Sequence, residues 1–212
     1  MTPPKASIKS FQEFKDSHGI RHSVLVQGLS YGHDNSSLKT FVSELGKENT
    51  RGVAVIDRQT TDHQLEELHQ CGVRGIRLDM YIEQAMRDAK KQKEMLIWYS
   101  DRIKHLGWSL GFLQLEPRNW HLLSEVIPTL PVHVVVDHYA LMKAPSMLPA
   151  GMTVSEQEGM AAIVKLLKGG NFWVKLSAPY RCSEAPLFDD MEELVKHLVR
   201  VNPRRVVWGS DW

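Results

Sequence analysis

The sequence predicts an α/β fold built from parallel strands and intervening helices. Short apolar runs alternate along the chain with longer amphipathic stretches, as they do in repeated βαβ units. The strand candidates begin about every 30 residues, which is the size of one such unit. They are rich in Val and Ile on both faces, a composition typical of strands that are buried on both sides. About seven units fit either a (β/α)8 barrel or an open, doubly wound sheet.

The expected strands are short apolar runs separated by amphipathic stretches. They span residues 22–27, 51–56, 75–80, 109–115, 132–138, 171–177 and 205–210. Helices are expected between them, at residues 35–47, 61–71, 93–106, 119–127, 156–168 and 188–201. Asn35 is a candidate N-cap, and Thr61 and Gln64 have the spacing of a capping box. Before the first strand, the segment IKSFQEFKDSHGI reads as a helix that ends at Gly19.

Polar side chains fall late in the expected strands, and this placement favours the barrel. They are Gln27, Arg77, Asp79, Gln114, Asp137, His138, Lys175, Ser177 and Asp211. A barrel gathers the carboxyl ends of its strands around one mouth, whereas an open sheet spreads them along an edge. We therefore expect one domain over residues 1–212, a (β/α)8 TIM barrel that lacks its first strand and its last helix. Its strands at 22–27 and 205–210 would have unpaired edges, so we expect poor stability or association and little turnover.

Composition excludes several classes of protein. Lys and Arg number 26 and Asp and Glu 25, a balance that argues against a nucleic-acid partner. The first residues lack the apolar run of a signal peptide, and no stretch is long enough to span a bilayer. Cys71 and Cys182 show no pairing pattern, so we expect free thiols in a reducing compartment. The prediction is a cytoplasmic protein without a membrane partner, and its oligomeric state is left open.

Two residues at strand ends are candidates for catalysis. His138 follows a wholly apolar strand, and an imidazole there could bind a metal, polarise a carbonyl or shuttle a proton. A histidine hydrogen-bonded to a loop carbonyl is an equal alternative. Asp211 follows Gly209 at the end of the last strand, where a carboxylate could act as general base or metal ligand. Its alternative role is to cap a following helix.

Two arginines are candidates for binding an anionic substrate. Arg77 lies within an expected strand, where a guanidinium is costly unless it is paired with Asp79 or with a bound anion. Arg181 follows another strand and could bind a carboxylate with both ends of its fork. Ser177 at a strand end and Tyr31 in the loop YGHDN are the further expected substrate contacts.

Six segments together resemble a known family. They are VLVQGLSYGHDN, GVRGIRLDMY, GWSLGFLQLE, VVVDHYALM, WVKLSAPYR and VVWGSDW. In order and spacing they are similar to the amidohydrolase-related branch of the amidohydrolase superfamily, over nearly the whole chain. The resemblance implies a (β/α)8 barrel that hydrolyses lactones or related cyclic esters and amides at the carboxyl ends of its strands. The substrate would be a small molecule bearing a carboxylate.

The resemblance also implies roles for individual residues. Asp211 matches the aspartate that activates water, and His138 matches a histidine that helps to polarise the scissile carbonyl. Arg77 and Arg181 match arginines that hold substrate carboxylates in the lactonases of the family. The chain departs from the family pattern at Glu83, where those lactonases have a second arginine. Dicarboxylate specificity therefore does not follow from the resemblance.

Two further departures lie at residues that contact the substrate in the family's lactonases. Leu113 stands in place of a tyrosine, and Leu29 stands near the position of a small hydroxyl residue, with Ser30 adjacent.

The family's His-x-His pair on the first strand is also missing from this sequence. His138 and Asp211 alone make a poor closed metal shell, so no tightly bound metal is expected, although a longer form could bind zinc. Three functions therefore compete: a lactone hydrolase, a metal-dependent decarboxylase or hydratase of the same superfamily, and a truncated, non-catalytic barrel.

Overall fold

The computed structural model describes residues 7–211. They form two compact units, one ending at Arg77 and the other beginning at Leu78. Each unit consists of parallel strands that alternate along the chain with helices. The expected alternation of strands and helices is therefore confirmed in both units. The single domain predicted over residues 1–212 stays a prediction.

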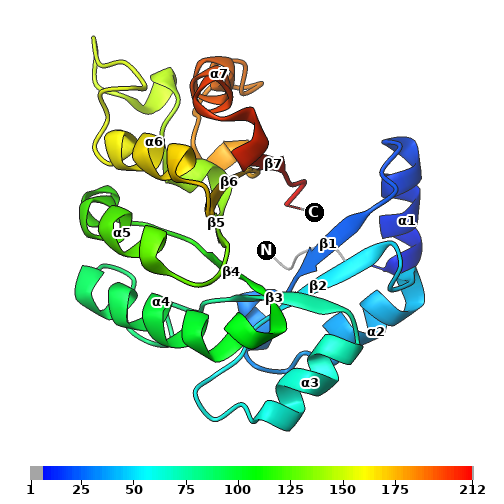
Figure 1. The fold of residues 1–212 in the computed structure, drawn as a ribbon. Helices are drawn as coiled ribbons and strands as arrows, with labels where there is room; N and C mark the ends of the chain where they lie inside the picture. The colour runs from blue at the N-terminus through cyan, green and yellow to red at the C-terminus, as the bar shows by residue number, and fades with distance from the viewer. Residues whose placement is uncertain (1–6, 212) are drawn as a thin grey trace. The chain divides into compact units, whose positions relative to one another are not determined.

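The first unit contains three strands and three α-helices (Figure 1). Its elements are α1 (Ile8–Ser17), β1 (Ser23–Val26), the 3-10 turn Leu29–Tyr31, α2 (Ser36–Leu45), β2 (Thr50–Ala54), α3 (Asp62–Gln70) and β3 (Val73–Arg77). β1 pairs with β2 and β2 with β3, both in parallel. Val42 of α2, Leu65 of α3 and Ile76 of β3 are fully buried and belong to the core of this unit.

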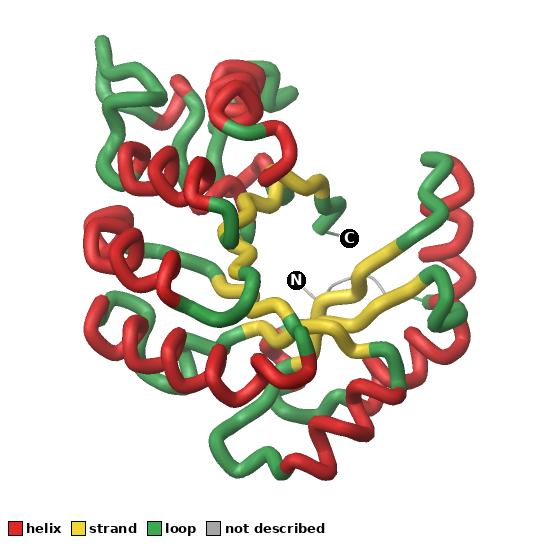
Figure 2. The backbone as a smooth tube through the Cα atoms, in the orientation of Figure 1, coloured by secondary structure: helices red, strands yellow, loops and turns green. Residues whose placement is uncertain are grey.

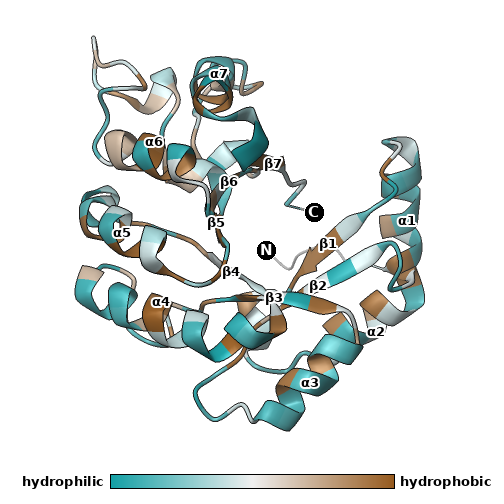
Figure 3. Ribbon diagram, viewed as in Figure 1, coloured by the Kyte–Doolittle hydropathy of each residue, from teal (hydrophilic) through white to brown (hydrophobic). Residues whose placement is uncertain are grey.

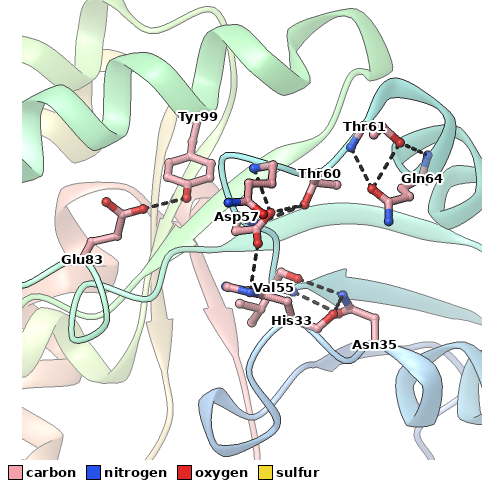
Figure 4. A network of polar contacts seen from close by, with 10 residues as sticks. His33, Asn35, Val55, Asp57, Thr60, Thr61, Gln64, Glu83 and Tyr99 are labelled. Atoms are coloured by element: carbon pink, nitrogen blue, oxygen red, sulfur yellow. Dashed lines mark hydrogen bonds and ion pairs between the residues drawn. The ribbon is translucent and has the colours of Figure 1, made fainter.

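The ends of the helices in the first unit test two predicted caps (Figure 4). Thr61 and Gln64 form the expected capping box at the start of α3. Asn35 precedes α2, but its side chain makes no capping hydrogen bond. Its amide oxygen instead accepts from the backbone N–H of Val55, and its amide nitrogen donates to the Val55 carbonyl. Asn35 therefore occupies the predicted N-cap position, but its side chain does not cap the helix because it bonds to the backbone beyond β2.

The second unit contains four parallel strands and four α-helices (Figure 1). They are α4 (Ala89–Ile103), β4 (Ser109–Phe112), α5 (Trp120–Val126), β5 (Val134–Val136), α6 (Met160–Gly169), β6 (Phe172–Leu176), α7 (Met191–Val201) and β7 (Val206–Trp208). Shorter 3-10 turns span Lys104–Leu106, Pro117–Asn119, Ile127–Thr129, His138–Leu141, Pro145–Met147, Pro179–Arg181 and Pro203–Arg205. In Figure 2 the strands of this unit run into loops at their carboxyl ends.

The two faces of the strands in the second unit differ in chemistry. Phe112, Trp120 and Phe172 are buried, with ring centroids 5.9 Å and 5.7 Å apart along the series. Phe112 lies on β4, Trp120 on α5 and Phe172 on β6, so the ring contacts join these two strands to α5. Figure 3 colours the ribbon of these elements by hydropathy. On β6 the alternate residues Trp173 and Lys175 are less buried than Phe172. The period of two therefore places Lys175 on the opposite face from the aromatic core.

The start of α4 and the end of β3 differ from their predicted positions. In both cases an aspartate that bonds to the backbone accounts for the difference. α4 begins at Ala89 rather than at residue 93, because Asp88 caps it by accepting from the backbone N–H groups of Lys90 and Lys91. The strand expected at 75–80 is β3, which ends at Arg77. Asp79 lies beyond it and accepts from the backbone N–H groups of Tyr81 and Ile82, which turns the chain. Among the described residues, no helix is long and apolar enough to cross a membrane.

Candidate active site at the ends of β5, β6 and β7

His138 lies at the carboxyl end of β5, in a turn of unusual conformation. His138, Tyr139, Ala140 and Leu141 are four consecutive residues with φ between 53° and 56°. None is glycine, and each such residue carries a conformational cost of order 1–3 kcal/mol. The turn is held by burial, because His138, Tyr139 and Ala140 are all buried. A costly backbone at a strand end is typical of functional sites.

The imidazole of His138 is held by Ser177, the residue that directly follows β6. His138 Nδ1 and Ser177 Oγ share a hydrogen bond of 2.8 Å, and both side chains are buried. The bond engages Nδ1, and Nε2 lies on the other side of the ring. Ser177 therefore orients the histidine, while its predicted contact with a substrate stays a prediction.

Asp211 approaches the same histidine from the end of β7. Its Oδ1 lies 3.9 Å from His138 Nε2, and its side chain is 30% exposed whereas that of His138 is 7% exposed. This distance is too long for a direct hydrogen bond but leaves room for a water that contacts both atoms. Gly209 permits the close approach of β7, since a Cβ there would lie 3.3 Å from Cβ of Ser177. The structure thus brings His138, Ser177 and Asp211 together.

A tyrosine that sequence reasoning missed completes the arrangement. The Tyr180 hydroxyl donates to Asp211 Oδ2 over 2.6 Å. This hydrogen bond, followed by burial, raises the pKa of the Tyr180 phenol, because the carboxylate disfavours a second negative charge beside it. The Arg181 guanidinium lies 5.5 Å from the centre of the Tyr180 ring. The position of Tyr180 directly before Arg181 was the available signal.

The loops that follow β5 and β6 are tied to each other beside the site. The backbone N–H of Ala144 donates to the Cys182 carbonyl over 2.8 Å, and Lys143 Nζ donates to the Arg181 carbonyl over 2.8 Å. The Cys182 thiol lies 3.6 Å from the carbonyl oxygen of His138. Burial raises the pKa of this thiol to about 11 although Lys143 and Arg181 oppose the shift. Cys182 is therefore a neutral packing group.

An ion pair lies next to these residues. Lys175 Nζ is 2.6 Å from Asp137 Oδ1, and the Asp137 side chain is only 5% exposed. Asp137 directly precedes His138, and Lys175 lies two residues before Ser177. The pair therefore joins the end of β5, which leads into His138, to the end of β6, which leads into Ser177.

Tyr31, Arg77 and Arg181 are the remaining predicted site residues. Tyr31 and Arg77 belong to the first unit, where Tyr31 ends a 3-10 turn and Arg77 is the last residue of β3. Arg181 is exposed on the loop after β6, next to Tyr180. The contacts of these three residues with a substrate stay predictions.

The cluster offers few side chains that could bind a metal ion. Within residues 7–211, no group of three or more His, Cys, Asp or Glu side chains is arranged to hold a metal ion. His138 and Asp211 supply two donors, and a protein site for zinc uses three or four. The described residues therefore do not fit a metal shell.

Comparison with known proteins identifies the family. The sequence model described as "Amidohydrolase" matches residues 1–212. This chain belongs to the amidohydrolase family. It is 30% identical over 221 residues to a 2-pyrone-4,6-dicarboxylate hydrolase of Comamonas testosteroni, covering 100% of this chain and 68% of the relative. It is 26% identical to a 4-sulfomuconolactone hydrolase of Hydrogenophaga intermedia, covering 100% of this chain and 66% of the relative.

A solved structure extends the comparison to the fold. A Pseudomonas putida protein named for 2-pyrone-4,6-dicarboxylic acid hydrolysis matches with a TM-score of 0.80 and 27% identity. The match covers 98% of this amidohydrolase and 73% of that chain. The predicted α/β fold of the amidohydrolase type is therefore confirmed. The chain spans about two thirds of the length of the curated relatives that it matches.

Proposed function

We propose that this amidohydrolase hydrolyses an anionic lactone, with Asp211 as the base that activates water. The observation that carries the proposal is the separation of 3.9 Å between Asp211 Oδ1 and His138 Nε2. A water between these atoms has an acceptor for its proton on one side. The names of the relatives, which are hydrolases of a pyrone dicarboxylate and of a sulfomuconolactone, support the same substrate class.

The proposed reaction needs only the side chains of the cluster. Asp211 takes a proton from water while the water oxygen bonds to the lactone carbonyl carbon. The oxygen that gains the negative charge is stabilised by an N–H on His138 Nε2, a tautomer that Ser177 supports by donating its hydroxyl to Nδ1. The ring C–O bond then breaks, and the leaving oxygen takes the proton back from Asp211. The product is the ring-opened hydroxy acid, or its keto form when the leaving oxygen is an enolate.

The charges near the cluster support an anionic substrate. Arg181 is exposed beside Tyr180, and Lys143 lies on the neighbouring loop. A guanidinium can bind a carboxylate through two parallel hydrogen bonds. Replacing Arg181 with Met is expected to raise KM for a dicarboxylate lactone more than it lowers kcat, because this contact serves binding.

The test is hydrolysis of 2-pyrone-4,6-dicarboxylate by the purified protein, followed by proton NMR so that ring opening and isomerisation give different spectra. Asp211→Asn is expected to lower the rate about 10²–10⁴-fold, the usual contribution of a general base. Asp101→Asn is the matched control, since Asp101 is exposed on α4 and pairs with Lys104 of the following 3-10 turn. A rate for Asp211→Asn equal to that of the wild type would exclude the proposed base. Prior dialysis against a chelator tests the metal-dependent alternative.

A further inference from the structure

The loop after β6 supplies both ends of one series of polar contacts. The series runs from Ser177 to His138, across 3.9 Å to Asp211, and on to Tyr180. Ser177 and Tyr180 are three positions apart on one loop, whereas His138 and Asp211 come from β5 and β7. Ser177 occupies Nδ1 of the histidine and Tyr180 occupies Oδ2 of the aspartate. Nε2 of the histidine and Oδ1 of the aspartate are the two atoms that lie 3.9 Å apart.

The Asp211 carboxylate keeps one orientation only if a partner such as the Tyr180 hydroxyl bonds to one of its oxygens. Its side chain is 30% exposed, and rotation about its last bond would exchange Oδ1 with Oδ2 at little cost, because that torsion has a broad, two-fold profile. A phenol bonded to Oδ2 at 2.6 Å restricts the rotation, since hydrogen bonds to charged acceptors are short and strong.

Tyr180 is itself held in place. Pro179 starts the 3-10 turn that carries it, and the Arg181 guanidinium lies near its ring. The side chains that act on its hydroxyl are Asp211 beyond β7, which accepts its hydrogen bond, and Arg181 on the same turn. The raised pKa of the phenol, caused first by the bond to Asp211, keeps the proton on Tyr180. It therefore remains a donor across the range in which an ionised Asp211 could act as a base.

We propose that Tyr180 is a positioning residue for Asp211, which fixes the carboxylate so that Oδ1 is presented toward His138. The role rests on the proposed function, in which Asp211 is the base. It is distinct from substrate binding, because the hydroxyl is engaged by the protein's own carboxylate. Loss of the hydroxyl should therefore affect the chemical step more than the binding of the substrate.

The first experiment needs no turnover. The Tyr180 ring carbon that bears the hydroxyl is followed by NMR against pH in the wild type, in Asp211→Asn and in Glu83→Gln. Asp211→Asn is expected to move the titration of Tyr180 to lower pH, because the charge that opposes ionisation is lost. Glu83→Gln is the control, since Glu83 accepts a 3.0 Å hydrogen bond from Tyr99 and should leave Tyr180 unchanged (Figure 4). An unchanged midpoint for Tyr180 in Asp211→Asn would overturn the proposal.

The second experiment measures kcat and KM for 2-pyrone-4,6-dicarboxylate. Tyr180→Phe is expected to lower kcat about tenfold, the equivalent of one hydrogen bond to a charged group, with KM changed less than about twofold. Tyr99→Phe also removes a phenol-to-carboxylate hydrogen bond and should leave both constants unchanged. An unchanged kcat for Tyr180→Phe, or an effect on KM alone, would overturn the positioning role. If the wild type opens no lactone, the proposed function fails, while the titration still decides whether Tyr180 holds Asp211.

Discussion

Lys175 on β6 and Asp137 beyond β5 form an ion pair of 2.6 Å beside the candidate site. The Asp137 side chain is nearly inaccessible, and that of Lys175 is 22% exposed. Burying two charges is costly unless they are paired with good geometry. The pair therefore fixes the separation of two strand ends, one of which leads into His138 and the other into Ser177.

Removal of the lysine is expected to destabilise the protein. Lys175→Met leaves Asp137 without this cation, and the free energy of unfolding in urea should fall by about 2–4 kcal/mol. The double variant Lys175→Met/Asp137→Asn should recover part of the loss. Lys165→Met, at an exposed position of α6, is the control. A change below about 0.5 kcal/mol for Lys175→Met would show that the pair contributes little.

The approach of β7 to β6 leaves no room for a side chain at Gly209. A Cβ there would meet Lys175 at 3.0 Å and 3.2 Å and Ser177 at 3.3 Å. Gly209→Ala is expected to cost about 1–3 kcal/mol, as overpacking does, and to lower the rate by displacing Asp211. Gly169→Ala is the control, because nothing lies within 4 Å of its added Cβ. Thermal unfolding of both variants measures the difference, and equal stability would contradict the predicted clash.

The hydroxyl of Ser177 should be needed for the orientation of His138. Ser177→Ala is expected to cost about 1–2 kcal/mol, because a buried imidazole nitrogen loses its partner, and to change the nitrogen NMR signals of the His138 ring. Ser124→Ala removes another buried hydroxyl, which donates to the His121 carbonyl. This control should leave the His138 signals unchanged. Unaltered His138 signals in Ser177→Ala would refute the assignment.

The two cysteines should differ in reactivity. Cys182 is buried with a pKa of about 11, so at pH 8 it is almost entirely the neutral thiol, whereas Cys71 is half-buried on the surface of the first unit. Alkylation followed by mass spectrometry should modify Cys71 first and Cys182 only near pH 11 or after unfolding. Fast modification of Cys182 in the folded protein at pH 8 would contradict its burial.

The strands and helices followed from the sequence because their signal is local. The apolar runs predicted seven strands, and the structure has a strand within each predicted range or within two residues of it. The predictions differ from the structure where a polar side chain can form hydrogen bonds with more than one backbone group. Asn35 bonds to Val55 across the chain, and Asp79 folds back on Tyr81 and Ile82. The partner depends on which backbone groups lie close to the side chain in the folded protein, and hydrophobic periodicity does not predict this.

The candidate site was predictable in part. The placement of His138 and Asp211 at strand ends indicated that they could meet, and the structure brings them to 3.9 Å. The contact of Ser177 with a substrate stays a prediction, and its bond to His138 was not foreseen. Tyr180 was missed because its partner is distant in sequence. The left-handed turn from His138 to Leu141 was also missed, because no glycine marks it.

Ser177 and Tyr180 lie on one short loop. The orientation of the His138 imidazole and that of the Asp211 carboxylate are therefore coupled. A shift of this loop would turn the imidazole and the carboxylate together, so a partly misaligned pair is hard to reach by small changes there. Variation that changes selectivity is consequently best tolerated in the loops of the second unit other than the one after β6, where insertions should be selected against.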